Sequence, residues 1–280
     1  MRLVLPSTSG INIVRSLKAF RNVLYDDHRL RRLGIRAGWY VRWHYQGRLN
    51  DRLGRAHRFE RIELRLGSRE IRLSIAEPYT GALKGIFVEH EYDCARQLGF
   101  VPETILDLGA NIGFGAIYLS TLFPMARFLL VEPDPRNIAH LRENVCANGI
   151  HATILEAAVG PESGHLTLRY GHDPTCSTLD GTKMHNNPNG VTVSVMTIPD
   201  VLHHVGWTNI DLMKMDIEGA EEMLLANRSQ WLERVRSIVM EIHPNTTLEQ
   251  IAKHLKPYGF VIRRLSFGNE PVYLASRAPE

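Results

Sequence analysis

The sequence predicts an α/β fold, a doubly wound sheet of seven mostly parallel strands with an N-terminal helical and β-hairpin extension. Short apolar runs alternate with helical patterns from residue 104 onward. Such alternation is typical of βαβ units, whose right-handed crossovers give a parallel sheet with helices on both faces. The last two extended runs have no helix between them, which indicates an antiparallel hairpin at the end of the chain.

We expect two units, an N-terminal arm with a hairpin over residues 1–84 and a sheet domain over residues 85–280. The arm shows helical patterns that break near Gly34, Gly38 and Gly47, which predicts two or three short helices. Strict alternation of charged and apolar side chains then predicts a β-hairpin. Its strands are expected at 59–66 and 70–75.

In the sheet domain the elements follow in regular order after a largely helical linking segment, 76–100. Strands of the main sheet are expected at 104–108, 127–132, 152–157, 210–215, 236–242, 259–265 and 271–276. Helices are expected at 113–123, 135–148, 219–227 and 246–257. Two further extended runs, 164–170 and 191–197, flank a polar loop at 171–190. This loop is longer than most loops without a function, so we expect it to face a substrate.

Composition is that of an ordinary globular protein, with 44% hydrophobic and 22% charged residues. The apolar runs are shorter than a membrane-spanning helix requires, and the N-terminus lacks the apolar core of a secretory signal. Three widely spaced cysteines without a C-x-x-C pair indicate reduced thiols. Together these features predict a cytoplasmic protein.

Charge is distributed unevenly along the chain. Residues 1–58 carry thirteen Lys and Arg against three Asp, a net charge of +10, so the remainder carries −7 of the total +3. Arginines in this basic arm alternate with Trp39, Tyr40, Trp43 and Tyr45. Such a surface could meet phosphates on a lipid surface, an anionic glycan or nucleic acid. We favour a helical face that covers the sheet domain or pairs with a second copy in a homodimer.

The segment 104–115, TILDLGANIGFG, predicts a strand, a glycine turn and a helix, which together begin a nucleotide-binding unit. Gly109 and Gly113 would let a ligand lie against backbone. Asp107 ends the strand, and its carboxylate would repel a pyrophosphate but suits a ligand with an ammonium and a sulfonium group. That ligand is S-adenosylmethionine. The candidate binding residues in this turn are Asp107, Gly109, Asn111 and Gly113.

The next two strand ends add candidates for the same nucleoside. Glu132, about 20 positions after the glycine turn, can accept hydrogen bonds from both ribose hydroxyls, and Pro133 follows it. Glu156 and the small Ala157 end the third strand, where the adenine edge would lie. Three strand ends therefore point to one nucleoside.

At this point the chain resembles the FkbM-type S-adenosylmethionine-dependent methyltransferases, over about residues 85–276. The resemblance depends on motifs at 105–113, 131–135, 156–160, 210–221 (IDLMKMDIEGAE) and 239–244 (VMEIHP). The block at 210–221 is the most specific to the family. The resemblance implies a class I, Rossmann-like fold and O-methylation of hydroxyls on sugars, glycans or secondary metabolites.

Five ionisable residues lie at the ends of the fourth and fifth strands: Lys214, Asp216, Glu218, Glu241 and His243. Methyl transfer to a hydroxyl needs a base, and His243 suits this role because the ordinary pKa of histidine leaves it mostly neutral at pH 7. Asp216 and Glu218 would orient the hydroxyl or stabilise the imidazolium. Lys214 is a further catalytic candidate, or a buried partner of Glu241.

A second chemistry uses the same strand ends. Asp216, Glu241 and His243 could hold a divalent cation that lowers the pKa of the hydroxyl. We favour a reaction without metal, because no pair of acids follows the fifth strand.

Two other functions fit parts of the sequence. The basic arm could grip nucleic acid for methylation of a base, but the extra carboxylate in the turn 216–219 would repel a phosphate backbone, so nucleic acid is disfavoured. A non-catalytic nucleotide-binding scaffold is opposed by the acids retained at the strand ends. The sequence does not identify the acceptor, since fold analogy does not choose a substrate.

Overall fold

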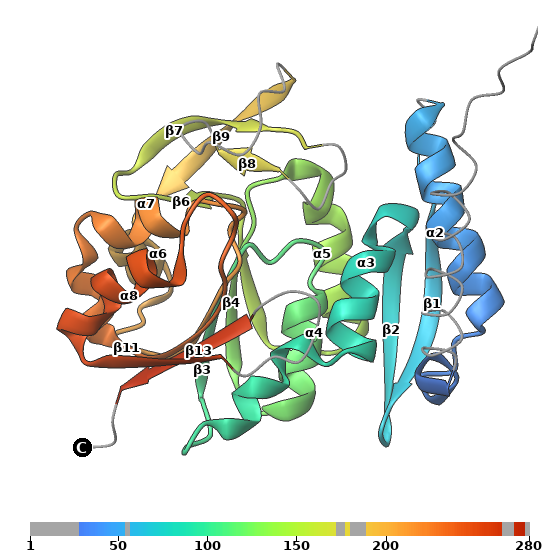
Figure 1. Ribbon diagram of the computed structural model, residues 1–280, viewed down its shortest axis with the longest axis horizontal. Coiled ribbons are helices and arrows are strands. Elements are labelled where there is room, and N and C mark those ends of the chain that lie inside the picture. Colours follow the sequence, from blue (N-terminus) through green and yellow to red (C-terminus); the bar gives the residue numbers. More distant parts are fainter. Residues whose placement is uncertain (1–27, 54–56, 172–176, 180–188, 265–271, 278–280) are drawn as a thin grey trace, which may run out of the picture.

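A computed structural model describes residues 28–53, 57–171, 177–179, 189–264 and 272–277. Its main sheet has seven strands in the order β12-β13-β11-β10-β3-β4-β5 (Figure 1). All neighbours are parallel except around β13, which runs antiparallel to both β11 and β12. The strands are β3 (Thr104–Leu108), β4 (Arg127–Val131), β5 (Ala152–Leu155), β10 (Ile210–Met215), β11 (Val235–Glu241), β12 (Phe260–Arg264) and β13 (Val272–Arg277). The predicted seven-stranded, mostly parallel sheet is confirmed.

Both faces of this sheet are buried, since side chains that alternate along a strand belong to two different hydrophobic clusters. Ile105 of β3 belongs to the cluster beneath one face, whereas Leu106 belongs to the cluster on the other. In Figure 1, α4 and α5 lie on one side of the sheet, and α6, α7 and α8 lie on the other. These helices are α4 (Phe114–Leu122), α5 (Pro135–Ala147), α6 (Ile198–Val205), α7 (Glu221–Ala226) and α8 (Leu248–Leu255). The sheet is therefore doubly wound, as predicted.

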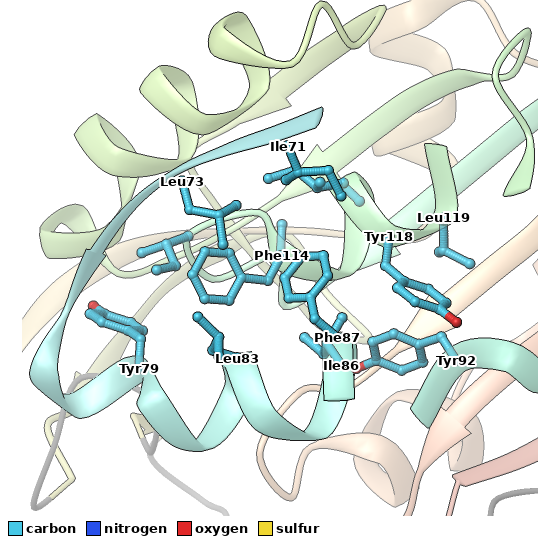
Figure 2. Close-up of a cluster of buried hydrophobic side chains, with 14 of the residues drawn as sticks. Ile71, Leu73, Tyr79, Leu83, Ile86, Phe87, Tyr92, Phe114, Tyr118 and Leu119 are labelled. Carbon is cyan, nitrogen blue, oxygen red and sulfur yellow. The ribbon is translucent and has the colours of Figure 1, made fainter. Parts of the chain in front are cut away.

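The N-terminal hairpin packs against α5 and continues the first cluster. The extension consists of α2 (Ala37–Arg52), β1 (Phe59–Leu66) and β2 (Arg69–Ala76). Short helical turns follow, at η1 (Glu77–Tyr79), α3 (Thr80–Leu83), η2 (Lys84–Val88) and η3 (Glu91–Gln97), so the linking segment is largely helical as expected. Figure 2 shows Phe87 between Leu83 and Tyr92, with Phe114 of α4 nearby. The rings of Phe87 and Phe114 meet edge to face, with centroids 5.6 Å apart.

The basic arm contains one long described helix where shorter ones were expected. Gly34 ends a helical turn with φ of +80°, but Gly38 and Gly47 lie inside α2. A Cβ atom on Gly47 would lie 2.9 Å from the Cβ of Glu77, so this glycine allows α2 to approach η1 closely. Trp43 of α2 is buried. The helix thus covers the linking segment, while contacts with a second copy or with phosphates stay predictions.

A second, four-stranded sheet lies over the carboxyl ends of the main strands (Figure 1). Its order is β6-β9-β7-β8, from β6 (Ala158–Val159), β7 (Gly164–Arg169), β8 (Thr178–Leu179) and β9 (Gly190–Met196). The third main strand therefore ends at Leu155, two residues earlier than predicted, because residues 158–159 pair with β9 instead. Most of the polar loop 171–190 lies outside the described residues.

Two further helical turns complete the described chain, η4 (Ser229–Arg234) and η5 (Lys256–Tyr258). Among the described residues, every helix is too short or too polar to cross a membrane.

Candidate active site

An open cleft lies where the carboxyl ends of β3, β4 and β10 meet the small sheet. Gly109 follows β3, Glu132 follows β4 and Asp216 follows β10, and all three line the cleft. The strand order reverses between β3 and β10, because the chain first runs outward from β3 through β4 and β5. Open α/β sheets bind ligands at such a reversal. The cleft is open to solvent and is lined by apolar residues with a few polar groups among them, as small-molecule sites commonly are.

The turn after β3 requires glycine at its first position. Gly109 has a φ of +73°, and a Cβ atom on it would lie 1.8 Å from the carbonyl oxygen of Asp216. Asn111 also has a positive φ, +52°, and its side-chain oxygen accepts a hydrogen bond from the backbone N–H of Ile112 at 2.8 Å. Strained backbone of this kind is held by its surroundings and is common at functional sites.

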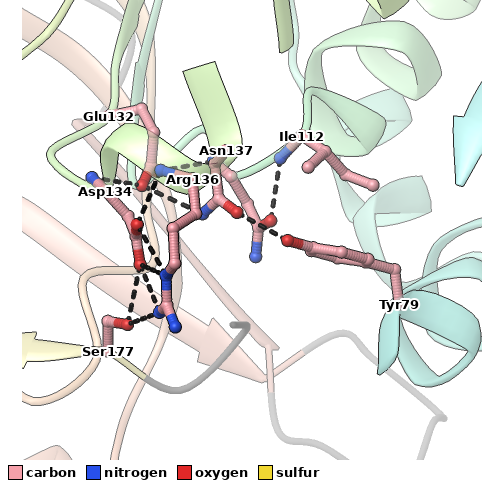
Figure 3. Close-up of polar contacts among 8 residues, drawn as sticks. Tyr79, Ile112, Glu132, Asp134, Arg136, Asn137 and Ser177 are labelled. Atoms are coloured by element: carbon pink, nitrogen blue, oxygen red, sulfur yellow. Dashed lines mark hydrogen bonds and ion pairs between the residues drawn. The ribbon is translucent and has the colours of Figure 1, made fainter. Parts of the chain in front are cut away.

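Glu132 is buried at the end of β4, where three N–H groups hold its carboxylate. The backbone N–H of Asn111 donates to it at 2.7 Å, and that of Asp134 donates at 2.9 Å. Nδ2 of Asn137 donates to it at 3.1 Å (Figure 3). Burial raises the pKa of this carboxyl to about 7, although the three hydrogen bonds act to lower that pKa. A carboxylate has about four lone-pair sites, so these three donors leave one for a ligand hydroxyl.

Asn137, on the first turn of α5, links Glu132 to the linking segment. Its Oδ1 accepts a hydrogen bond from the hydroxyl of Tyr79 at 2.6 Å, and all three side chains are buried. Asn137 also lines the cleft, although sequence analysis missed it. A polar residue near a helix start usually caps the helix or faces solvent. Its sequence signal is the helical spacing to Leu141 and Asn144, which lie buried on the same helix.

A second polar network ties α5 to the small sheet. Asp134 caps α5 by accepting a hydrogen bond from the backbone N–H of Arg136, and it also pairs with the Arg136 guanidinium at 2.6 Å (Figure 3). The hydroxyl of Ser177, just before β8, donates to Asp134 at 2.9 Å. The guanidinium also lies 3.7 Å from the ring centre of Tyr170. These contacts fix the small sheet above the cleft.

Lys214 is buried beneath the glycine turn and joins two acids. Its Nζ lies 3.0 Å from Oδ1 of Asp107 and 3.4 Å from Oδ2 of Asp216, and it donates to the carbonyl oxygen of Gly109 at 3.1 Å. Burial alone would lower the pKa of Lys214, but the two acids raise it above its usual range. Burial raises the pKa of Asp107 despite the neighbouring ammonium.

These positions change two sequence-based expectations. Asp107 is fully buried, and neither it nor Lys214 lines the cleft. In this arrangement neither side chain reaches the cleft, although both were expected to act there. Together they hold the glycine turn and Asp216 in place from behind.

His243 lies just after β11, among four carboxylates. We call these five side chains the His243 cluster. Its Nδ1 lies 2.7 Å from Oε1 of Glu221. Its Nε2 faces the other three at 3.5–4.0 Å: Glu218, Asp216 and Glu241. Burial alone would lower the pKa of the imidazole, but the hydrogen bond to Glu221 and the surrounding acids outweigh it and raise the pKa to about 10. These surroundings favour the protonated imidazole, whereas the sequence led us to expect a neutral base.

The His243 cluster opens onto the cleft through the turn after β10. Asp216 and Glu218 line the cleft, whereas Glu221 is fully buried. Glu218 has a φ of +51° and Gly219 a φ of +91°, so the turn is in the left-handed region at two successive residues. Asn245 donates to the carbonyl oxygen of Gly219 at 2.6 Å and supports this turn. Glu221, at the start of α7, holds His243 through the contact with Nδ1.

Comparison with known proteins decides the family. Residues 107–262, more than half of the chain, match the methyltransferase FkbM domain. The chain belongs to this methyltransferase family. One similar protein is methyltransferase sdnD of Sordaria araneosa, 31% identical over 217 residues that cover 65% of this chain and 82% of the relative.

Other relatives of this methyltransferase are more distant. The 31-O-demethyl-FK506 methyltransferase FkbM of Streptomyces tacrolimicus is 25% identical over 191 residues, 57% of this chain and 73% of the relative. The 2-O-methyltransferase NoeI of Sinorhizobium fredii is 27% identical over 151 residues, 49% of this chain and 62% of the relative. Among solved structures, precorrin-6y C5,15-methyltransferase of Geobacter metallireducens aligns at 14% identity with a TM-score of 0.43, covering 69% of this chain and 88% of that one.

Most cofactor residues expected for this methyltransferase line the cleft: Gly109, Asn111, Glu132, Pro133, Ala157 and Asp216. Gly113 and Glu156 do not. A Cβ atom on Gly113 would lie 2.8 Å from Cδ1 of Leu141, so this glycine allows α4 to pack against α5. Glu156 is 55% exposed and pairs with Arg142 at 2.6 Å. The early end of β5 at Leu155 turns Glu156 away from the cleft.

Proposed function

We propose that this methyltransferase uses S-adenosylmethionine to methylate a hydroxyl group of a sugar, glycan or secondary metabolite. The observation that carries the proposal is the position of Glu132, a buried carboxylate beside a glycine turn at the reversal of strand order. Its remaining lone pair suits a ribose hydroxyl. Gly109 keeps the facing backbone clear of side chains, and Ala157 leaves room for a flat base.

The names of two relatives support oxygen as the atom that receives the methyl group. One is a 31-O-demethyl-FK506 methyltransferase and the other a 2-O-methyltransferase. Both names describe transfer to an oxygen. Transfer to oxygen also fits the cleft of this chain, because Asp216 and Glu218 line it and carboxylates accept hydrogen bonds from hydroxyl groups.

S-adenosylmethionine supplies, when bound, a sulfonium methyl group that a hydroxyl oxygen can displace. Asp216 is held on one side by Lys214 at 3.4 Å and by the hydroxyl of Tyr92 at 3.3 Å, so it orients the acceptor. Glu218 accepts the hydroxyl proton, because it lines the cleft and lies in the turn with positive φ that follows β10. His243 lies beside both carboxylates, with Nε2 3.9 Å from Oδ1 of Asp216 and 3.5 Å from Oε2 of Glu218. Holding the acceptor in line contributes about 7–11 kcal/mol to lowering the barrier.

A methyl-transfer assay tests this function. Purified protein would be incubated with methyl-labelled S-adenosylmethionine and a panel of sugars, glycans and hydroxylated metabolites, followed by mass spectrometry of the products. We expect a methyl ether and S-adenosylhomocysteine in equal amounts, with turnover lowered at least about a hundredfold in Glu218→Gln, as for loss of a general base. A Glu222→Gln control should retain turnover, because Glu222 contacts Gln250 of α8 and does not line the cleft. Transfer to nitrogen or carbon, or none to any hydroxyl, contradicts the proposal.

A further inference from the structure

The outward face of α2 carries a row of exposed apolar side chains. Tyr45, Leu49 and Leu53 are 52%, 46% and 52% exposed. Their spacing of four residues aligns them along the helix, and the backbone N–H of Leu53 donates to the carbonyl oxygen of Leu49 at 3.0 Å, so the helical turn reaches Leu53. We call these three side chains the α2 row. We propose that the α2 row and the arginines around it bind the surface of an anionic lipid membrane.

The α2 row is not what holds the helix in place, because the opposite face does so. Tyr40 and Trp43 are buried. The hydroxyl of Tyr40 donates to the carbonyl oxygen of Thr80 at 3.3 Å, and Nδ2 of Asn50 donates to Oε1 of Glu77 at 3.2 Å. These contacts fix α2 against the linking segment and leave the α2 row directed outward.

The α2 row is also a concentration of exposed apolar surface. Eight large hydrophobic side chains are exposed in the described part of the chain, and three of them form this row. The other five are scattered over β1, α8, β12 and two loops. Single exposed apolar side chains are ordinary, whereas a contiguous group indicates a binding surface.

The charge around the α2 row is strongly positive. Residues 28–58 carry nine Arg, no Lys and a single Asp, a net charge of +8 with His neutral. Arg42 is exposed three residues before Tyr45, so it lies on the same face of the helix. Arg32 and Arg36 are exposed just before α2 begins. The rest of the chain has a net charge of −5, so an anionic surface attracts this arm and repels the remainder.

The position of α2 makes the α2 row accessible to a broad surface. In Figure 1, α2 lies at the edge of the molecule opposite α6, α7 and α8, on the outer side of the hairpin formed by β1 and β2. A membrane can therefore meet this edge without contacting the main sheet.

An anionic lipid surface fits both the apolar and the basic side chains. Apolar and aromatic groups of an interfacial helix enter the boundary between headgroups and acyl chains, while arginines pair with lipid phosphates. A nucleic acid would pair with the arginines but would give Leu49 and Leu53 little to bury against. A two-fold dimer through this face would bring two basic arms together. A stable dimer also buries about 800 Å² per partner, more than three half-exposed side chains offer.

Sedimentation of the full-length protein with vesicles tests the proposal. Vesicles of phosphatidylcholine would be compared with vesicles of equal parts phosphatidylcholine and phosphatidylglycerol. We expect binding to the mixed vesicles only, weakened by added salt. The partition coefficient should fall at least about tenfold in the double variant Leu49→Ser with Leu53→Ser, and also in Arg42→Glu. Absence of binding, equal binding to both kinds of vesicle, or unchanged binding in both variants overturns the proposal.

Matched controls come from outside the arm. Leu248, at the start of α8, is 40% exposed, and Arg263 of β12 is exposed. Leu248→Ser and Arg263→Glu should bind the mixed vesicles as the wild type does, and an equal loss in these controls overturns the assignment to the α2 row. Urea unfolding curves that coincide with that of the wild type show that each variant is folded.

Two measurements on the same samples identify the other possible occupants. A dimer in analytical ultracentrifugation that dissociates in the leucine double variant, in place of vesicle binding, assigns the α2 row to a second copy. Binding of duplex DNA or RNA that is lost in Arg42→Glu but kept in the leucine double variant, in place of vesicle binding, assigns the arm to nucleic acid. Either result overturns the proposal. These assays need neither cofactor nor turnover, so their outcome does not depend on the proposed function.

Discussion

Replacing Lys214 with methionine leaves Asp107 with a buried charge and no ammonium beside it. Asp107 is 0% exposed, and its Oδ1 lies 3.0 Å from Nζ of Lys214. Removing one partner of a buried ion pair costs about 3–5 kcal/mol, because the remaining charge can neither reach water nor find another partner. We therefore expect the free energy of unfolding of Lys214→Met to fall by about 3–5 kcal/mol.

Urea unfolding followed by circular dichroism measures this loss. The double variant Asp107→Asn with Lys214→Met should recover a large part of the stability, because the amide carries no charge. Arg142→Met is the matched control, since Arg142 pairs with Glu156 at 2.6 Å but both side chains are 55% exposed. We expect the control to lose less than about 1 kcal/mol. A cost for Lys214→Met no larger than that of the control refutes the reasoning.

Three further predictions concern the cleft. Gly109→Ala should abolish cofactor binding, because the Cβ of the alanine would lie 1.8 Å from the carbonyl oxygen of Asp216. Normal cofactor binding by the variant in calorimetry would contradict this prediction. Tyr79→Phe removes the 2.6 Å hydrogen bond to buried Asn137 and should lower the free energy of unfolding by about 1–3 kcal/mol, measured in urea. The pKa of Glu132 is raised to about 7 in the folded state, which therefore binds more protons than the unfolded state between about pH 4.5 and 7. The stability that this carboxyl contributes should therefore fall as the pH rises through that window. The urea midpoint of the wild type should be lower at pH 8 than at pH 5, and this difference should be smaller in Glu132→Gln. An equal fall in both proteins speaks against the shifted pKa.

The sequence predicted the main sheet well because its signals are local. Runs of apolar residues mark strands buried on both faces, and acids at their ends placed Glu132 and Asp216 correctly at the cleft. Errors arose where distant partners decide the local structure. Gly47 continues α2 because it packs against Glu77, and the third strand ends early because residues 158–159 pair with β9.

The chemistry of the site was less predictable than its position. The charge on His243 depends on acids from two strand ends and from α7, which only the fold brings together. Asp107 is conspicuous in the sequence, yet it lies behind the cleft because Lys214 holds it there. Asn137 is inconspicuous, yet it lines the cleft because it joins Tyr79 to Glu132. Hydrogen-bond partners far apart in sequence cannot be read from local patterns.

The central claim is that the cleft at the strand ends binds S-adenosylmethionine through Glu132. Calorimetric titration with S-adenosylmethionine and S-adenosylhomocysteine tests it most directly, with Glu156→Ala as the control, since Glu156 is an acid outside the cleft. We predict saturable binding to the wild type and to Glu156→Ala, and none to Glu132→Ala. Absence of binding to the wild type, or equal binding to all three proteins, would contradict the claim.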